Sequence, residues 1–286
     1  MARILGVGIA TVDIINFVDH YPHEDEELRA ISQHKVRGGN VTNTLCVLSQ
    51  LGHQCDWLGT LAEDPDAKII TDDLDHYDIA YDKVIIHNTG KVPTSYITLN
   101  RQTASRTIVH YRDLPELQFT EIDTNNYREY DWIHFEGRNV EQLHKLISSI
   151  KSDHPDIPLS LEIEKERAGI KSLFPYMDLL LFSKNYTLAK GYSHAEDLFQ
   201  SLDIKIAAIC AWGDKGAYGL SAHKKLVHSE AEKIETVVDS IGAGDTFNAG
   251  IIDSFIHKRP LKTSLEFANQ LAGRKIQRQG FEGILK

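Results

Sequence analysis

One short segment of the chain combines residue types suited to phosphoryl-transfer chemistry. Residues 239–250 read DSIGAGDTFNAG, in which Gly242, Ala243 and Gly244 stand directly before Asp245 and an apolar run. Small residues at the start of a helix let backbone N–H groups approach a ligand closely, and together with the helix dipole they form an anion site. Asp245 also fits a helix cap, but a cap needs no Gly-Ala-Gly before it. A carboxylate beside a phosphate cradle can accept the proton of an attacking alcohol while the N–H groups stabilise the transferred group.

A second group of polar residues lies near the N-terminus. Asp13 follows the first apolar run, and Gly39, Asn40 and Asn43 stand at the start of a helical pattern. A carboxylate can accept hydrogen bonds from two hydroxyls, and an amide offers a donor and an acceptor together, which suits a vicinal diol. Taken alone, Asp13 fits a solvated loop acid better, and Asn40 also fits a helix cap, a role that is compatible with sugar binding.

The pattern of apolar residues predicts the elements that must position these groups. Strands are expected at residues 3–10, 55–61, 83–87, 132–135, 158–163, 179–183 and 206–211, and helices after residue 40 and at 67–76, 140–150 and 247–256. The last helix is apolar nearly all round, so we expect it to be buried. Strands that alternate with helices predict a parallel sheet covered by helices on both faces.

Two alternating segments do not fit this rhythm. Residues 96–100 and 106–111 flank a polar turn and predict a hairpin, which together with the alternating residues 13–18 indicates a small, separate antiparallel sheet. Alternation places Arg106, Ile108 and His110 on one face of the hairpin. We therefore expect a three-layer α/β body with a β-lid, as a single catalytic domain over residues 1–286 with a lid subregion at about 13–38 and 88–112.

Composition limits the partners of the chain. It has 286 residues and a formal net charge of −10, which disfavours nucleic acid and anionic membranes as partners. No stretch approaches the ~18 unbroken apolar residues of a membrane span, and the N-terminal residues lack a signal-peptide pattern. The three cysteines, Cys46, Cys55 and Cys210, have no metal-binding spacing and apolar neighbours, so we expect packing residues in a reducing compartment. These features predict a cytoplasmic protein.

Two motifs resemble the signatures of a known family. Residues 239–252 match, position by position, the C-terminal signature of the ribokinase-like sugar kinases, also called the phosphofructokinase-B family, and residues 37–43 (RGGNVTN) resemble its N-terminal glycine-rich signature. Further strings, at 134–139, 162–165, 210–212 and 279–284, resemble the branch of the family that phosphorylates ketohexoses. The likeness extends over residues 5–284. It implies a three-layer α/β/α ribokinase-like body with a mostly parallel central sheet and a small β-sheet lid.

The resemblance also implies roles for individual residues. Asp245 becomes the general base for the C1 hydroxyl of the sugar, and Gly242, Ala243 and Gly244 become the anion hole for the γ-phosphoryl group of ATP. The implied sugar-binding residues are Asp13, Gly39, Asn40 and Asn43. The implied nucleotide-binding residues are Arg106, Gly213, Asp214, Lys215, Gly216 and, as an adenine contact, Ile276. Without the family, Arg106 reads equally as a surface strand residue, residues 213–216 as a plain turn, and Ile276 as core packing.

The same resemblance implies cofactors and partners. It implies ATP with Mg²⁺ bound to the nucleotide, it admits a monovalent cation such as K⁺, and it implies a homodimer through the β-lid. The acidic residues 25–27 are then expected to contact the partner subunit or its active site. An Asn-x-x-Glu motif that organises Mg²⁺ in many relatives is missing at residues 183–187, so the sequence names no protein ligand for the metal. Glu162, Glu164 and Lys165 are candidates for an outer shell around it.

Several functions remain open from the sequence. The resemblance favours transfer of the γ-phosphoryl group of ATP to the C1 hydroxyl of a ketohexose, D-fructose to fructose 1-phosphate above all. A related kinase for another sugar or a nucleoside is the alternative, and a non-catalytic sugar- or nucleotide-sensing protein is an alternative of another class, which Asp245 disfavours. A dinucleotide-dependent oxidoreductase is disfavoured because Gly6 and Gly8 lack the third glycine of that fingerprint. No GxxxxGK[ST] motif is present, which disfavours a P-loop kinase.

Overall fold

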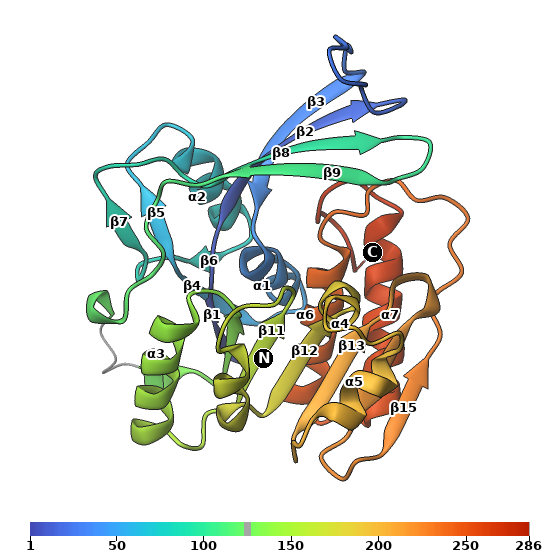
Figure 1. Cartoon of the computed structure of the whole chain (residues 1–286). Helices are drawn as coiled ribbons and strands as arrows, with labels where there is room; N and C mark the ends of the chain where they lie inside the picture. The colour runs from blue at the N-terminus through green and yellow to red at the C-terminus, as the bar shows by residue number, and fades with distance from the viewer. Residues whose placement is uncertain (123–126, 286) are drawn as a thin grey trace.

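The computed structural model describes residues 1–122 and 127–285, and a large sheet forms its centre (Figure 1). Within these residues the sheet has nine strands in the order β15-β14-β13-β12-β11-β10-β1-β4-β6. The strands are β1 (Arg3–Val7), β4 (Gln54–Leu58), β6 (Ile79–Ala80), β10 (Trp132–Glu136), β11 (Leu159–Ile163), β12 (Leu179–Ser183), β13 (Ala207–Ala211), β14 (Ala217–Leu220) and β15 (Leu226–Ser229). Only the pairs β13–β14 and β14–β15 of this sheet are antiparallel. The expected mostly parallel sheet is confirmed.

Helices cover both faces of this sheet. The helices are α1 (Asn40–Gln50), α2 (Ala67–His76), α6 (Ala243–Ile256) and α7 (Leu261–Ile276) on one face, and α3 (Val140–Asp153), α4 (Lys184–Ala189) and α5 (Ala195–Ser201) on the other. Successive strand side chains point to opposite faces. Thus Leu179 and Leu181 join the core beneath the first group of helices, while Leu180 joins the core beneath the second. The expected three-layer α/β/α body is therefore confirmed.

A second sheet projects from the body as a lid (Figure 1). Its strands are β2 (Thr11–Val18), β3 (Ser32–Gly38), β8 (Thr94–Asn100) and β9 (Arg106–Tyr111), in the order β3-β2-β8-β9. The lid was expected to be antiparallel, but β2 and β8 pair in parallel. Both strands leave the body in the same direction, with the N–H of Val12 donating to the carbonyl of Pro93 at 2.9 Å, so a hairpin and a second β-pair lie side by side.

One predicted strand is broken in the structure. Residues 55–61 do not form one strand: β4 ends at Leu58, and β5 (Thr60–Ala62) pairs instead with β7 (Ile85–His87). A Cβ atom at Gly59 would lie 2.4 Å from the carbonyl oxygen of Gly8, so the chain approaches β1 too closely there for any side chain. β1 likewise ends at Val7 and not at residue 10.

The expected buried helix is α6. Its residues from Asp245 to Ser254 are all buried. A Cβ atom at Gly250 would lie 2.9 Å from Cα of Ala268, so α6 packs closely against α7 at this point. The close packing fixes the start of α6 relative to the carboxyl edge of the sheet, where the functional groups gather.

The three cysteines are buried, as expected for packing residues. Burial raises the pKa of Cys46 and of Cys210 to about 12, and it raises the pKa of Cys55 as well. Thiols held in this way are poor nucleophiles. None of the helices in the described part of the chain combines the length and the apolar character that a bilayer crossing needs.

Candidate active site

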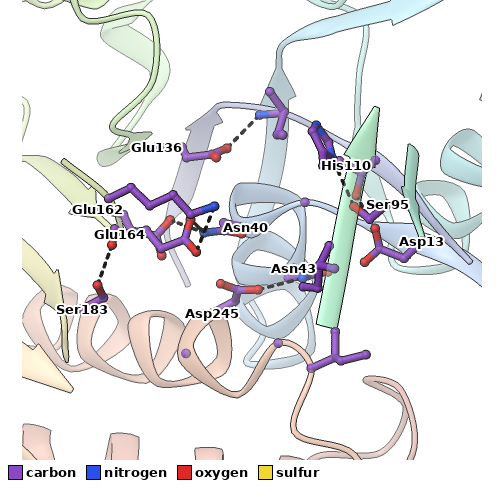
Figure 2. A pocket seen from close by; sticks show the side chains of 18 of the residues that line it. Asp13, Asn40, Asn43, Ser95, His110, Glu136, Glu162, Glu164, Ser183 and Asp245 are labelled. Carbon is purple, nitrogen blue, oxygen red and sulfur yellow. Dashed lines mark hydrogen bonds and ion pairs between the residues drawn. The ribbon is translucent and has the colours of Figure 1, made fainter. Parts of the chain in front are cut away.

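A cavity of about 400 Å³ lies between the lid and the carboxyl ends of the main-sheet strands (Figure 2). Eleven residues singled out from the sequence line it: Asp13, Gly39, Asn40, Asn43, Arg106, Glu162, Glu164, Lys165, Gly242, Gly244 and Asp245. Parallel strands deliver their carboxyl ends to one edge of a sheet, and crevices at that edge are the usual ligand sites of α/β folds. The starts of α1 and α6 meet the lid at this edge.

Asp245 lies in the first turn of α6 and is 8% exposed. The Asn43 Nδ2 group donates a hydrogen bond of 2.7 Å to its Oδ2 atom. Burial raises the pKa of Asp245 to about 7; the hydrogen bond from Asn43 opposes this rise, and the charges of Glu164 and Glu136 add to it. A carboxylate with a near-neutral pKa at a helix N-terminus is well suited to act as a general base.

A second carboxylate, Glu162, lies on the other side of the α1 start. It accepts hydrogen bonds from Asn40 Nδ2 at 3.2 Å and from Asn248 Nδ2 at 3.0 Å. Burial raises the pKa of Glu162 well above its usual range, and the charge of Asp245 acts in the same direction. The two buried carboxyls therefore titrate as an interacting pair.

Asp13 forms the lid side of the cavity. Its Oδ1 atom accepts a hydrogen bond of 2.8 Å from the Thr11 hydroxyl. Burial raises the pKa of Asp13, and the hydroxyls of Thr11 and Ser95 and the charge of Arg37 oppose the rise. The Thr11 hydroxyl orients the carboxylate before any ligand arrives.

His110 extends this arrangement, as Figure 2 shows. Its Nδ1 atom lies 3.3 Å from Oγ of Ser95. The contact joins His110 on β9 to Ser95 on β8, and either atom can be the donor. Burial lowers the pKa of His110, and the charges of Arg138 and Arg112 lower it further, so the ring is neutral near pH 7. The sequence placed His110 on the cavity face but assigned it no role.

Arg106 connects the lid to the loop before α6. Its Nη1 atom donates to Oγ of Ser240 at 3.1 Å and lies 3.4 Å from the carbonyl oxygen of that residue. The N–H of Ala243 also contacts the Ser240 carbonyl, at a long 3.4 Å. Arg106, Ile108 and His110 all line the cavity, so the predicted face of β9 is confirmed.

Five of the predicted nucleotide-binding residues do not line this cavity. Gly213, Asp214, Lys215 and Gly216 form the turn between β13 and β14, at the same edge of the sheet. Gly216 has a φ of 80°, and a Cβ atom there would lie 2.0 Å from the carbonyl oxygen of Ser229, so packing requires this glycine. Ile276 ends α7, where its carbonyl accepts the N–H of Val238 at 2.7 Å. Their nucleotide role stays a prediction.

Several cavity residues had no assigned role from the sequence. Glu136 ends β10; it accepts the N–H of Ile9 at 3.0 Å and lies 3.3 Å from Arg138. Ser95 and His110 also line the cavity, and the sequence assigned no role to either of them. The available signal was a charged residue at the end of an otherwise apolar predicted strand, since such a residue sits at the carboxyl edge of a parallel sheet.

Oxygen groups suited to a magnesium ion are present in the cavity. Glu164 accepts a hydrogen bond from Asn40 at 3.4 Å, and Glu162, Ser183 and Asn185 lie on the same wall. Carboxylate and amide oxygens, with nucleotide phosphates, are the ligands that Mg²⁺ prefers. The residues present therefore fit a metal that arrives with a nucleotide.

A second cluster of possible metal ligands lies outside the cavity. His53, Asp253 and His257 bring their ligand atoms within 4.8 Å of one another. The N–H of Ala2 donates to Nδ1 of His53 at 3.2 Å, so this nitrogen carries no proton. The other ring nitrogen of His53, Nε2, then donates to Asp253 at 3.0 Å. Arg259 occupies the other oxygen of Asp253 at 2.7 Å. Both oxygens of Asp253 are thus already engaged, one by the His53 ring and the other by the Arg259 guanidinium.

Comparison with known proteins identifies the family. A family model described as pfkB family carbohydrate kinase matches residues 1–284. The chain belongs to the pfkB family of carbohydrate kinases. It is 35% identical to ketohexokinase of Mus musculus over 294 residues, which covers 99% of each chain. It is 23% identical to an ATP-dependent ribose-1-phosphate kinase of Halopiger xanaduensis over 98% of this chain and 94% of that one.

Solved structures of the family have the same fold. Ribokinase of Arabidopsis thaliana complexed with ribose and ATP aligns with a TM-score of 0.80 and 19% identity, covering 99% of this chain and 97% of that chain. A nucleoside kinase of Methanocaldococcus jannaschii aligns with a TM-score of 0.77 and 18% identity, covering 99% and 94%. The ribokinase-like fold expected from the two signatures is confirmed, and so is the expectation of a carbohydrate kinase.

Proposed function

We propose that this kinase transfers the γ-phosphoryl group of ATP to the C1 hydroxyl of a ketohexose, D-fructose in the first place, giving fructose 1-phosphate. The observation that carries the proposal is the buried Asp245 carboxylate at the start of α6, bonded to Asn43 in the same cavity as Asp13 and Asn40. The likeness to mouse ketohexokinase over the whole chain supports the choice of sugar.

In this mechanism each group of the cavity has a defined task. Asp13 and the amides of Asn40 and Asn43 hold the sugar hydroxyls, since carboxylate and amide groups match paired hydroxyls. Asp245 takes the proton of the C1 hydroxyl as the oxygen attacks the γ-phosphorus. The N–H groups at residues 242–244 and the guanidinium of Arg106 stabilise charge on the transferred group.

The proposed nucleotide site extends beyond the cavity. We place the phosphates of ATP at the start of α6 and the rest of the nucleotide toward the turn at residues 213–216 and the end of α7 near Ile276. Mg²⁺ bound to ATP would supply charge neutralisation, with Glu164 and Glu162 as the nearest carboxylates on that wall.

A coupled ADP-release assay tests the proposal. The purified protein is mixed with Mg-ATP and one of D-fructose, other ketohexoses, ribose, ribose 1-phosphate or adenosine. We expect the highest kcat/KM with D-fructose, and phosphorus-coupled carbon NMR of the product should place the phosphate on C1. A preference for ribose 1-phosphate or adenosine would replace the sugar in the proposal, and no turnover with any acceptor would contradict it.

We also propose that two chains associate through the lid. Ile14, Tyr96 and Val109 stand in register across three strands, and Tyr96 and Val109 are 48% and 66% exposed. An exposed apolar sheet face is a typical association surface. The acidic residues 25–27, at the tip of the β2–β3 connection, would then contact the partner subunit. Light scattering should give the mass of a dimer for the natural chain and of a monomer for Val109→Asp.

A further inference from the structure

We propose that Lys275 is a built-in cation that fixes the anion-hole loop before α6. The inference rests on the proposed kinase function and names a positioning residue for it. It concerns a buried charged group that neither sequence signature accounts for.

Lys275 is enclosed completely. It lies near the end of α7 and is 0% exposed, which is exceptional for a lysine. Its Nζ atom donates to Oδ2 of Asp239 at 2.8 Å and lies 3.2 Å from the carbonyl oxygen of the same residue. The ring of Phe281 covers the ammonium group at 5.3 Å from its centre. A carboxylate, a carbonyl and an aromatic face together are a cation site.

This site is joined directly to the anion-hole loop. Oδ1 of Asp239 accepts the N–H of Ile241 at 2.9 Å, and Oδ2 accepts the N–H of Gly280 at 3.2 Å. Gly242 follows Ile241, and a Cβ atom at Gly242 would lie 2.2 Å from the ring of Phe281. The ammonium group therefore holds both residues, Asp239 and Phe281, that determine the path of the loop into α6.

Stability alone does not explain a buried ion pair at this place. Burying two charges is costly, and well-packed apolar residues of similar volume are often equal or better. Burial lowers the pKa of Lys275, while the charges of Asp239 and Asp245 raise it. The ammonium group therefore has its place beside the carboxylate that holds the N–H of Ile241 in the loop.

The test separates a cation from a packing residue with one double variant. Lys275→Met alone leaves the Asp239 carboxylate buried and unpaired, so we expect a large loss of stability. Lys275→Met with Asp239→Asn removes both charges and keeps an oxygen for the N–H of Ile241, so we expect its Tm to return toward that of the natural chain. Its kcat should stay about 100-fold low with the sugar KM little changed, as for loss of one preorganised charge-stabilising group.

One further readout completes the experiment. Calorimetry should show the double variant binding the ATP analogue AMP-PNP about 10-fold more weakly while binding AMP unchanged, a readout that needs no sugar and so stands even if the proposed sugar is wrong. A double variant with recovered Tm and a kcat near that of the natural chain, or with unchanged AMP-PNP binding, would overturn the inference.

Discussion

The amide of Asn43 donates a hydrogen bond of 2.7 Å to the carboxylate of Asp245, across 202 positions of sequence. The bond joins the first turns of α1 and α6, and the Thr44 hydroxyl adds a contact of 3.4 Å to the carbonyl oxygen of Asp245. The residue expected to hold the sugar thus also orients the residue expected to activate it. The Asn43–Asp245 bond therefore links the proposed sugar-binding residue to the proposed base.

Replacing the base should abolish turnover while leaving the fold intact. For Asp245→Asn we expect kcat to fall by about 10³- to 10⁴-fold with sugar and nucleotide affinity largely kept, because a general base is lost and the amide oxygen can still accept from Asn43. Steady-state kinetics and calorimetry measure the two quantities. Asp56→Asn is the matched control: this buried carboxylate pairs with Arg3 outside the cavity, so its loss should lower stability and spare kcat. Equal kcat losses in both variants would place the base elsewhere.

The pH dependence of the reaction should report the same carboxylate. Because the pKa of Asp245 is raised to about 7, kcat/KM should rise with pH up to about 7 and then level off. The sign for stability is opposite. A raised folded pKa means that the native state binds the proton more tightly than the unfolded chain, so this group destabilises the fold increasingly as pH rises from about 3.8 to 7. Asp245→Asn should therefore have a higher Tm than the natural chain at pH 8 but not at pH 4; a flat rate profile between pH 5 and 8 would contradict the assignment.

Two glycines of the anion hole should respond to alanine in opposite ways. A Cβ atom at Gly244 meets nothing within 4 Å, so Gly244→Ala should stabilise α6 by about 0.5–1 kcal/mol, yet its methyl group enters the cavity and should lower kcat/KM for ATP about 100-fold. Gly242 has a φ of 77° and faces the ring of Phe281, so Gly242→Ala should cost about 3 kcal/mol of stability. Thermal unfolding and ATP kinetics distinguish the two variants. Full activity of Gly244→Ala would contradict a phosphate site at Gly244.

The His110–Ser95 pair, which lines the cavity with Asp13, should act on the sugar. We expect His110→Ala to raise the sugar KM about 10-fold with little change in kcat, because the wall beside Asp13 loses support in the ground state and transition state alike. His110→Asn, whose amide can bond to Ser95 in place of the ring, should recover most of that loss. Thr107→Ala, on the opposite face of β9, is the control and should leave KM unchanged. Failure of the asparagine variant to recover KM would show that the bond to Ser95 does not support sugar binding.

The fold and the central site could be predicted from local patterns because their signals are local. The glycine-rich start of α6 is visible within a few residues, and it predicts the site at residues 242–245. The alternation in β9 is equally local, and it predicts that Arg106 faces the cavity. The parallel pairing of β2 with β8 could not be read, since strand direction in a sheet depends on where both strands leave the body.

The groups that the sequence missed depend on long-range contacts. His110 is positioned by Ser95 on the neighbouring strand, and Lys275 by the loop at Asp239. Each looks ordinary in its own segment: a strand histidine and a helix lysine near the C-terminus of α7. Only the folded chain brings these two side chains into contact with the residues that bond to them.

The most direct test is a crystal structure of the protein with AMP-PNP, Mg²⁺ and D-fructose. We expect the C1 hydroxyl of the sugar within hydrogen-bond distance of the Asp245 carboxylate, with the γ-phosphate at the N–H groups of residues 242–244. A carboxylate of Asp245 that points away from both ligands, or a sugar bound outside the cavity of Asp13 and Asn43, would contradict the account.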